Sequence, residues 1–228
     1  MLDTAPSGMG STLSFRYYLY VSDSKVDMLL AQMDPAFTRK RTTEVSLNLK
    51  IFGGKRASEA PAGGERTARL QRVVRYLEDH GDLGTVDEPG QFFWGLMPLR
   101  WGPFPAEPTL AYFGGSAEGT VVGLGGSGNH FLGAAPAAAP AIPRSLTPSL
   151  LAGLRADPGI GALAETIKHP DDEHHRTALA AVHRANEAMP GPEQNLEFVA
   201  KRLLHGPSPT TAGTRVLLGS PLYVALVD

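Results

Sequence analysis

The sequence predicts a single α+β domain: a mainly antiparallel sheet with a glycine-rich hairpin region and helices packed on at least one face. Three observations lead to this expectation. Apolar and polar residues alternate with a period of two in several segments, which is typical of strands. Other segments repeat apolar residues at the i, i+3, i+4, i+7 spacing of an amphipathic helix. A block of predicted helices lies between two groups of strands, which favours one sheet and one domain.

The fold is expected to begin with a strand that leads into a helix. Residues 15–21 alternate aromatic and aliphatic side chains in a pattern that suits a pleated surface. Residues 25–33 then place their apolar side chains at helical spacing. The turn between them consists of Ser22, Asp23, Ser24 and Lys25.

This polar turn has two interpretations. In the first, serine and aspartate oxygens cap the helix and Lys25 lies in solvent. In the second, the free N–H groups and the helix dipole attract an anion, and Lys25 strengthens the attraction. The sequence leaves both open, so the four turn residues are candidate ligand-binding residues.

The remaining elements follow from the same periodicities. Further helices are expected at residues 65–80, 146–156, 171–189 and 194–205. Further strands are expected at residues 43–51, 91–104, 110–113, 120–124, 130–132, 214–218 and 222–227.

The segment 91–104 is rich in aromatic residues and is interrupted by glycine and proline. Because proline cannot donate to a central ladder, we expect an irregular strand at a sheet edge. Arg100 precedes Trp101, so it can stack on an aromatic ring or reach an anion, and it is a further candidate binding residue. The alternative is that the tryptophans of this segment pack in the core.

The predicted helix 65–80 has an arginine at every third position, which produces a slanting basic band. Its members are Arg66, Arg69, Arg72 and Arg75. The band is either a surface for phosphate or an acidic partner, or a solvated helix face.

The glycine-rich region between residues 110 and 132 is the most distinctive part of the chain. Turns are expected at residues 114–116 and 125–129, between short strands. Residues 123–128 match G-x-G-x-x-G, but no helix can follow them, so a dinucleotide-binding fingerprint is not indicated. A glycine-rich backbone can still approach a ligand closely. The side chains that would contact such a ligand are Ser127, Asn129 and His130.

Composition narrows the function classes. The chain has 228 residues, no cysteine and a net charge of −2, so disulfides and thiol chemistry are excluded and the overall charge argues against nucleic-acid binding. Residues 1–14 are expected to be a disordered tail, and residues 134–143 an Ala/Pro linker inside a single domain spanning residues 15–228. No leader or membrane span is indicated, and a cytoplasmic protein is expected.

Familiar catalytic motifs are missing from the sequence. Histidine and acidic residues cluster between positions 169 and 183, but without the spacing of a known metal site. There is no G-x-S-x-G elbow, no P-loop and no visible carboxylate pair. We therefore predict no metal site, and the sequence names neither a cofactor nor a catalytic residue.

Several segments resemble a family of uncharacterised actinobacterial proteins, a domain of unknown function. They are YYLYVSDSKVDML, FFWGLMPLRWGPF, YFGGSAEGTVVGLGGSGNHFLG, FVAKRLLHGPSP and RVLLGSPLYVAL. The resemblance implies an intracellular bacterial protein with a part in signalling or defence. It implies no catalytic residues.

Two functional hypotheses remain. The first is a non-catalytic module that binds an anionic, nucleotide-like small molecule or a protein partner, near the turn at residues 22–25 and the loop at residues 125–129. The second is an enzyme that acts on a phosphorylated or otherwise anionic substrate with Lys25, Arg100 and His130. Convergence of these three side chains in one cleft, with an acid nearby, would favour the enzyme.

Overall fold

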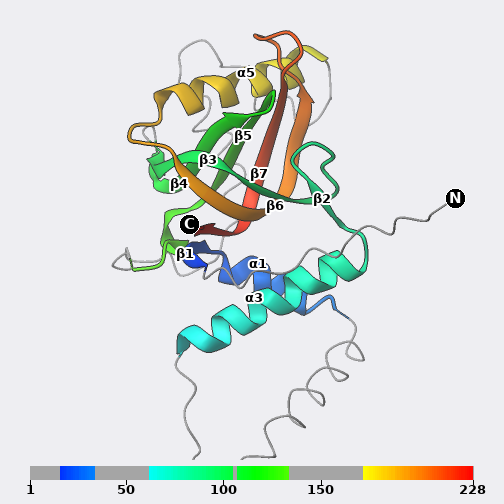
Figure 1. Ribbon diagram of the computed structural model, residues 1–228, viewed down its shortest axis with the longest axis vertical. Helices are drawn as coiled ribbons and strands as arrows, with labels where there is room; N and C mark the ends of the chain where they lie inside the picture. Colours follow the sequence, from blue (N-terminus) through cyan, green and yellow to red (C-terminus); the bar gives the residue numbers. More distant parts are fainter. Residues whose placement is uncertain (1–15, 34–61, 105–106, 134–171, 228) are drawn as a thin grey trace, which may run out of the picture.

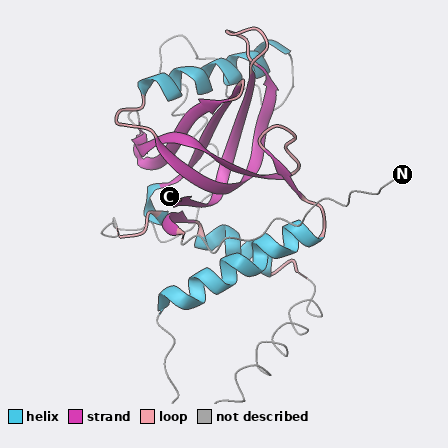
Figure 2. Cartoon of the chain, viewed as in Figure 1, coloured by secondary structure: helices cyan, strands magenta, loops and turns pink. Residues whose placement is uncertain are grey.

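A small β-barrel with helices on its outer surface forms the structured part of the chain. The computed structural model describes residues 16–33, 62–104, 107–133 and 172–227. The expected tail, linker, strand 43–51 and helix 146–156 lie outside the described residues. The predicted α+β class is confirmed (Figures 1 and 2).

Seven strands form one mixed, mostly antiparallel sheet. They are β1 (Tyr17–Val21), β2 (Leu83–Thr85), β3 (Phe92–Phe104), β4 (Glu107–Ala117), β5 (Thr120–Ser127), β6 (Gln194–Pro207) and β7 (Arg215–Leu226).

The barrel closes because β6 pairs with both β3 and β7, the two long strands that each have three neighbours. β3 pairs with β4 and β6, β4 pairs with β5, β5 pairs in parallel with β7, and β7 pairs back to β6. These five strands form the ring, while β1 extends from β7 and the short β2 extends in parallel from β3. Closing a sheet in this way removes most of its unpaired edges.

The helices cover the barrel from two sides. α5 (Asp172–Ala188) lies across β4, β5 and β7, at the top of Figure 1. α1 (Asp23–Leu30) and α3 (Ala62–Asp79) cross each other on the opposite side, below the barrel in the same view. The single turn η1 (Gly128–His130) follows β5. No helix in the described ranges is long and apolar enough to cross a membrane.

Strand alternation divides the apolar residues into an interior and two outer layers. Phe93, Phe113 and Phe198 are fully buried in the barrel interior. The layer under α5 includes Tyr112, while Val199 belongs to the layer under α1 and α3. Most strands are thus covered on both faces, so their sequences are apolar on both faces as well.

The glycines of the β4–β5 hairpin allow α5 to approach the barrel closely. Gly114 and Gly123 are cross-strand partners on the face under α5. A β-carbon on Gly114 would overlap the side chain of Asn186, and one on Gly123 would lie 2.8 Å from Cγ1 of Val182. The space that the glycines leave is filled by Asn186 and by the buried ring of Tyr112. The glycine pattern therefore has a packing cause in this part of the hairpin.

The expected turns of this region are partly wrong. Residues 114–116 belong to β4, and β5 extends to Ser127. The hairpin turns instead at Glu118 and Gly119, both of which have positive φ angles, as tight two-residue hairpins require. The expected strand at residues 130–132 is reduced to a single bridge between Phe131 and Tyr20.

The helix expected at residues 194–205 is also wrong, because these residues form β6. The residues from Leu196 to Ala200 are all buried, since the strand lies between the barrel interior and the outer helices. Burial on both faces produced apolar residues at helical spacing without a helix. The helices expected at 25–33, 65–80 and 171–189 are confirmed as α1, α3 and α5.

The sheet-edge position expected for residues 91–104 is wrong as well, because β3 belongs to the barrel wall. Its ladder with β6 ends at Leu99, and its ladder with β4 begins at Arg100. Pro98 therefore pairs only with β6, and Pro103 only with β4. Because each proline has a partner strand on one edge alone, the N–H group that it lacks is not needed for a second ladder.

Candidate functional site

The two segments that the sequence singled out, residues 22–25 and 127–130, lie at the same end of the barrel. The amide of Leu132 donates to the carbonyl of Leu19, and the rings of Tyr20 and His130 are in edge contact with centroids 5.7 Å apart. Burial lowers the pKa of His130, and the positive charge of Lys25 lowers it further. The fold therefore brings Lys25 and His130 within electrostatic range.

The serine and aspartate side chains of these segments are mostly engaged within the protein. Ser22 is the N-cap of α1 by position, but its side chain makes no capping hydrogen bond. The carboxylate of Asp23 binds Arg66 of α3 at 2.9 Å. Ser127 accepts a hydrogen bond from the amide of Asn129. The turn thus holds α1 against α3 as well as opening the helix.

Lys25 does not extend freely into solvent. Its Nζ donates to the carbonyl of Pro221 at 2.9 Å, and burial lowers its pKa to about 8. The side chain borders a cleft of about 370 Å³ between α1, α3 and the sheet. We call this the Lys25 cleft.

Arg100 lies elsewhere. Its guanidinium pairs with Glu193 at 3.3 Å, near the start of β6. Its neighbour Trp101 packs against the interior cluster and donates to Gln194, so alternation places Arg100 on the outer face of β3. Arg100 does not line the Lys25 cleft.

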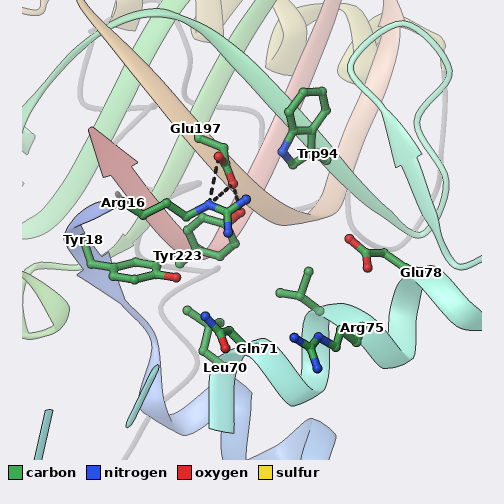
Figure 3. Close-up of a pocket in the computed structure, with 10 residues that line it drawn as sticks. Arg16, Tyr18, Leu70, Gln71, Arg75, Glu78, Trp94, Glu197 and Tyr223 are labelled. Atoms are coloured by element: carbon green, nitrogen blue, oxygen red, sulfur yellow. Dashed lines mark hydrogen bonds and ion pairs between the residues drawn. The ribbon is translucent and has the colours of Figure 1, made fainter. Parts of the chain in front are cut away.

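A second cleft lies along α3, between that helix and the barrel, and sequence reasoning missed it. We call it the Arg16 cleft (Figure 3). It encloses about 200 Å³. Its barrel side is formed by Arg16, Tyr18, Trp94, Glu197 and Tyr223, and its α3 side by Leu70, Gln71, Val74, Arg75 and Glu78.

A buried carboxylate organises the Arg16 cleft. Glu197 is 6% exposed, and its oxygens lie 2.8 and 3.0 Å from Nε of Arg16. The hydroxyl of Tyr223 donates to the same carboxylate. Burial raises the pKa of Tyr223, and the neighbouring carboxylate raises it further. The three side chains form a fixed network, and Figure 3 shows the Arg16 guanidinium at the centre of the cleft.

The α3 side of this cleft explains part of the arginine band. Arg66 and Arg69 form ion pairs with Asp23 and Asp27 of α1. Arg75 instead lies on the exposed side of α3 and lines the Arg16 cleft. The band is therefore neither a uniform phosphate surface nor only a solvated face.

The residues of the Arg16 cleft are distant in sequence, which is why pattern reading did not find them. Arg16 and Glu197 are 181 positions apart. One local signal existed: Glu197 is a charged residue between Leu196 and Phe198, as in the apolar–polar alternation of a strand. The helical interpretation of residues 194–205 concealed that signal.

The described ranges contain no group of three or more His, Asp or Glu side chains placed to hold a metal ion. The Arg16 cleft offers a guanidinium held by Glu197, a second arginine, aromatic side chains and an engaged carboxylate.

Comparison with known proteins gives one result. Residues 16–228 match a family described as a family of unknown function (DUF7019). Comparison with curated proteins and with solved structures finds no match. Because the match covers nearly the whole chain, the protein belongs to this family of unknown function.

Proposed function

We propose that the protein is a non-catalytic module that binds an anionic small molecule with one planar ring, such as a nucleotide, in the Arg16 cleft. One observation carries the proposal. Two arginines, Arg16 and Arg75, line the same cleft as the exposed aromatic side chain Trp94. Guanidinium groups bind phosphate and carboxylate oxygens, and an indole face stacks on a planar ring.

The network around Glu197 supports a binding role for Arg16. The carboxylate engages Nε and the Tyr18 hydroxyl is a further hydrogen-bond partner of the guanidinium, so its remaining N–H groups can donate to a ligand. The carboxylate also holds the guanidinium in place before a ligand arrives, which lowers the entropic cost of binding. Gln71, on α3, adds an amide that can donate to and accept from the edge of a ring.

The size of the cleft limits the ligand. A volume of about 200 Å³ accommodates a single ring with its substituents, while a dinucleotide would extend far outside it. The anionic group would lie toward the two arginines, and the ring toward Trp94.

The enzymatic alternative has less support. Lys25, Arg100 and His130 do not line one cleft: neither Arg100 nor His130 lines the Lys25 cleft, Arg100 pairs with Glu193, and Lys25 binds a backbone carbonyl. In the Arg16 cleft, Glu197 accepts from both Arg16 and Tyr223, so it is a poor general base.

Tryptophan fluorescence tests the proposal directly. The variant Trp101→Phe leaves Trp94 as the single tryptophan of the chain, since the protein has two. In that background we would titrate cytidine and uridine 5′-monophosphates, whose bases are single rings, with adenosine and guanosine 5′-monophosphates as larger probes and ribose 5-phosphate as a probe without a base. At least one nucleotide should quench Trp94, and ribose 5-phosphate should bind more weakly.

Two variants and a matched control localise the binding. By calorimetry, Arg75→Gln should weaken binding about five-fold or more, because a charge-assisted hydrogen bond contributes about 1 kcal/mol or more. Trp94→Leu should weaken it by a similar factor. Arg72→Gln removes another exposed arginine of α3, one that does not line the cleft, so the affinity of this variant for the nucleotide should be unchanged. If all three variants bind equally well, the proposed site is wrong.

A further inference from the structure

The Lys25 cleft lies on the other side of α3 from the Arg16 cleft, and its chemistry is different. It is the larger of the two, at about 370 Å³, and most of its wall is apolar. Met28, Leu29, Val73, Phe92 and Leu222 form that wall. Two amines, those of Lys25 and Lys201, border it. The argument below does not depend on the proposed function of the Arg16 cleft.

The acids of α1 are paired away from Lys25. Asp23 binds Arg66, and Asp27 binds Arg69, so both carboxylates of the helix are neutralised by α3. Lys25 donates instead to the uncharged carbonyl of Pro221. An amine held by a neutral acceptor in an apolar cleft has no counter-ion that favours its protonated form.

The other charged and titratable groups around Lys25 have mixed signs. Lys201 and His130 are basic, and Arg66 is positive although it is paired. Asp82 and Tyr76 also line the cleft. Asp82 is exposed, whereas Lys25 is half-buried and its amine is held by the carbonyl of Pro221.

We propose that the amine of Lys25 is a nucleophile that forms an imine with an aldehyde or ketone carrying an anionic group. The apolar wall would hold the body of this carbonyl compound, and Lys201 would attract its anionic group. Desolvation of a lysine in an apolar pocket is a known way to activate an amine for this chemistry.

The reaction balances without an oxidant or reductant. The Nζ lone pair attacks the carbonyl carbon, and a C–N bond forms while the carbonyl π electrons move to oxygen. A proton passes from nitrogen to that oxygen and gives a carbinolamine. Loss of water, with a second proton from nitrogen, then leaves the C=N bond. Hydrolysis reverses the sequence.

The acidity of Lys25 is consistent with this role. Burial lowers its pKa to about 8, from an ordinary value of 10.5. At pH 7 the neutral fraction of such an amine is roughly 300-fold larger than that of an unperturbed lysine. A lower intrinsic nucleophilicity and restricted access reduce this advantage, so we expect a rate at least ten-fold above that of an exposed lysine.

Reductive trapping tests the proposal on the intact protein. The probe is 4-formylbenzoate, an aldehyde with a carboxylate, together with cyanoborohydride, which delivers hydride to the imine carbon and makes the link permanent. Peptide mapping by mass spectrometry then gives the labelling rate at each lysine. At pH 7, Lys25 should be labelled at least ten-fold faster than the exposed Lys201, with a rate that rises with pH and levels off above about pH 8.

Two variants complete the test. Lys25→Arg keeps the positive charge but cannot form an imine, so it should abolish the fast labelling while its circular dichroism spectrum stays unchanged. Lys201→Gln should remove the preference for 4-formylbenzoate over uncharged benzaldehyde. Labelling that follows solvent exposure, with no enrichment at Lys25, would overturn the proposal, and an unchanged preference in Lys201→Gln would overturn the role given to that residue.

Discussion

Asn186 of α5 is the side chain whose removal should damage the barrel most specifically. Its Oδ1 accepts from the hydroxyl of Tyr112 at 2.8 Å. Its Nδ2 donates to the carbonyls of Gly115 at 3.2 Å and Val122 at 3.0 Å. One amide thus joins α5 to both strands of the glycine-rich hairpin, through the gap that the glycines leave.

The cost of Asn186→Ala follows from the groups that it would strand. Tyr112 is fully buried, so its hydroxyl would lose its acceptor at a cost of about 1–3 kcal/mol. The two carbonyls would each lose a donor, at about 0.5–1 kcal/mol apiece. We expect a total destabilisation of about 2–5 kcal/mol. Tyr112→Phe alone should cost about 1 kcal/mol.

Urea unfolding followed by circular dichroism measures these values, and a double-mutant cycle isolates the coupling. In the double variant the stranded hydroxyl is gone, so its cost should be about 1–2 kcal/mol less than the sum of the single variants. Glu187→Ala, at the exposed neighbouring position, is the control and should change stability by less than about 0.5 kcal/mol. A loss below about 1 kcal/mol for Asn186→Ala, or additive costs, would refute this account of the hairpin.

Three further predictions concern stability. Burial holds the pKa of Lys25 at about 8 in the folded protein, so between pH 8 and 10.5 the unfolded state binds more protons and the stability of the protein rises with pH. Lys25→Met should therefore stabilise the protein by about 1–2 kcal/mol at pH 7, and in urea titrations this gain should shrink toward pH 10.5. A gain that does not depend on pH would contradict this. Gly123→Ala places a methyl group against Val182 and the Tyr112 hydroxyl and should lower stability by about 1–3 kcal/mol; a neutral result would show that α5 can retreat. Glu197→Leu should lower the free energy of unfolding by about 1–3 kcal/mol, because the Tyr223 hydroxyl loses its acceptor. Adding Tyr223→Phe should restore most of that stability. If it restores none, packing and not the hydrogen bond is responsible for the loss.

Local periodicity was sufficient for much of the fold. The helical spacing in residues 25–33 and 65–80 comes from burial on one face, which a short window of sequence records directly. The strand at residues 15–21 was also recognised, although its burial does not follow the alternation: Leu19, Tyr20 and Val21 are all buried, while Tyr17 is exposed. The strands at 110–113 and 120–124 are buried on both faces and were recognisable from short apolar runs bounded by glycines. A pocket was expected near the turn at residues 22–25 and the loop at residues 125–129. The structure brings Tyr20 and His130 into contact at one end of the barrel, but no residue of that loop lines the Lys25 cleft.

Periodicity failed where burial has two sides. Residues 194–205 lie between the barrel interior and the outer helices, so their apolar residues imitate a helix face. The closed barrel itself was not predictable, because closure depends on which strands pair, and β5 pairs with β7 across most of the C-terminal half of the chain. The glycines of the hairpin were read as turns because the helix that needs their space is distant in sequence.

By itself, the sequence determined the α+β class, three of the helices, the junction between the first strand and the first helix, and the absence of thiol chemistry, since each depends on residue type or short-range spacing. The polar turn is shorter than predicted, because α1 begins at Asp23. Only the tertiary structure decided which side chains meet. Arg16, Glu197 and Tyr223 form one network because β1, β6 and β7 pair side by side. The pKa of Lys25 is lowered because the side chain is buried between α1, α3 and the sheet, and that arrangement exists only in the folded chain. Contacts of this kind join residues far apart in the chain, so no local pattern records them.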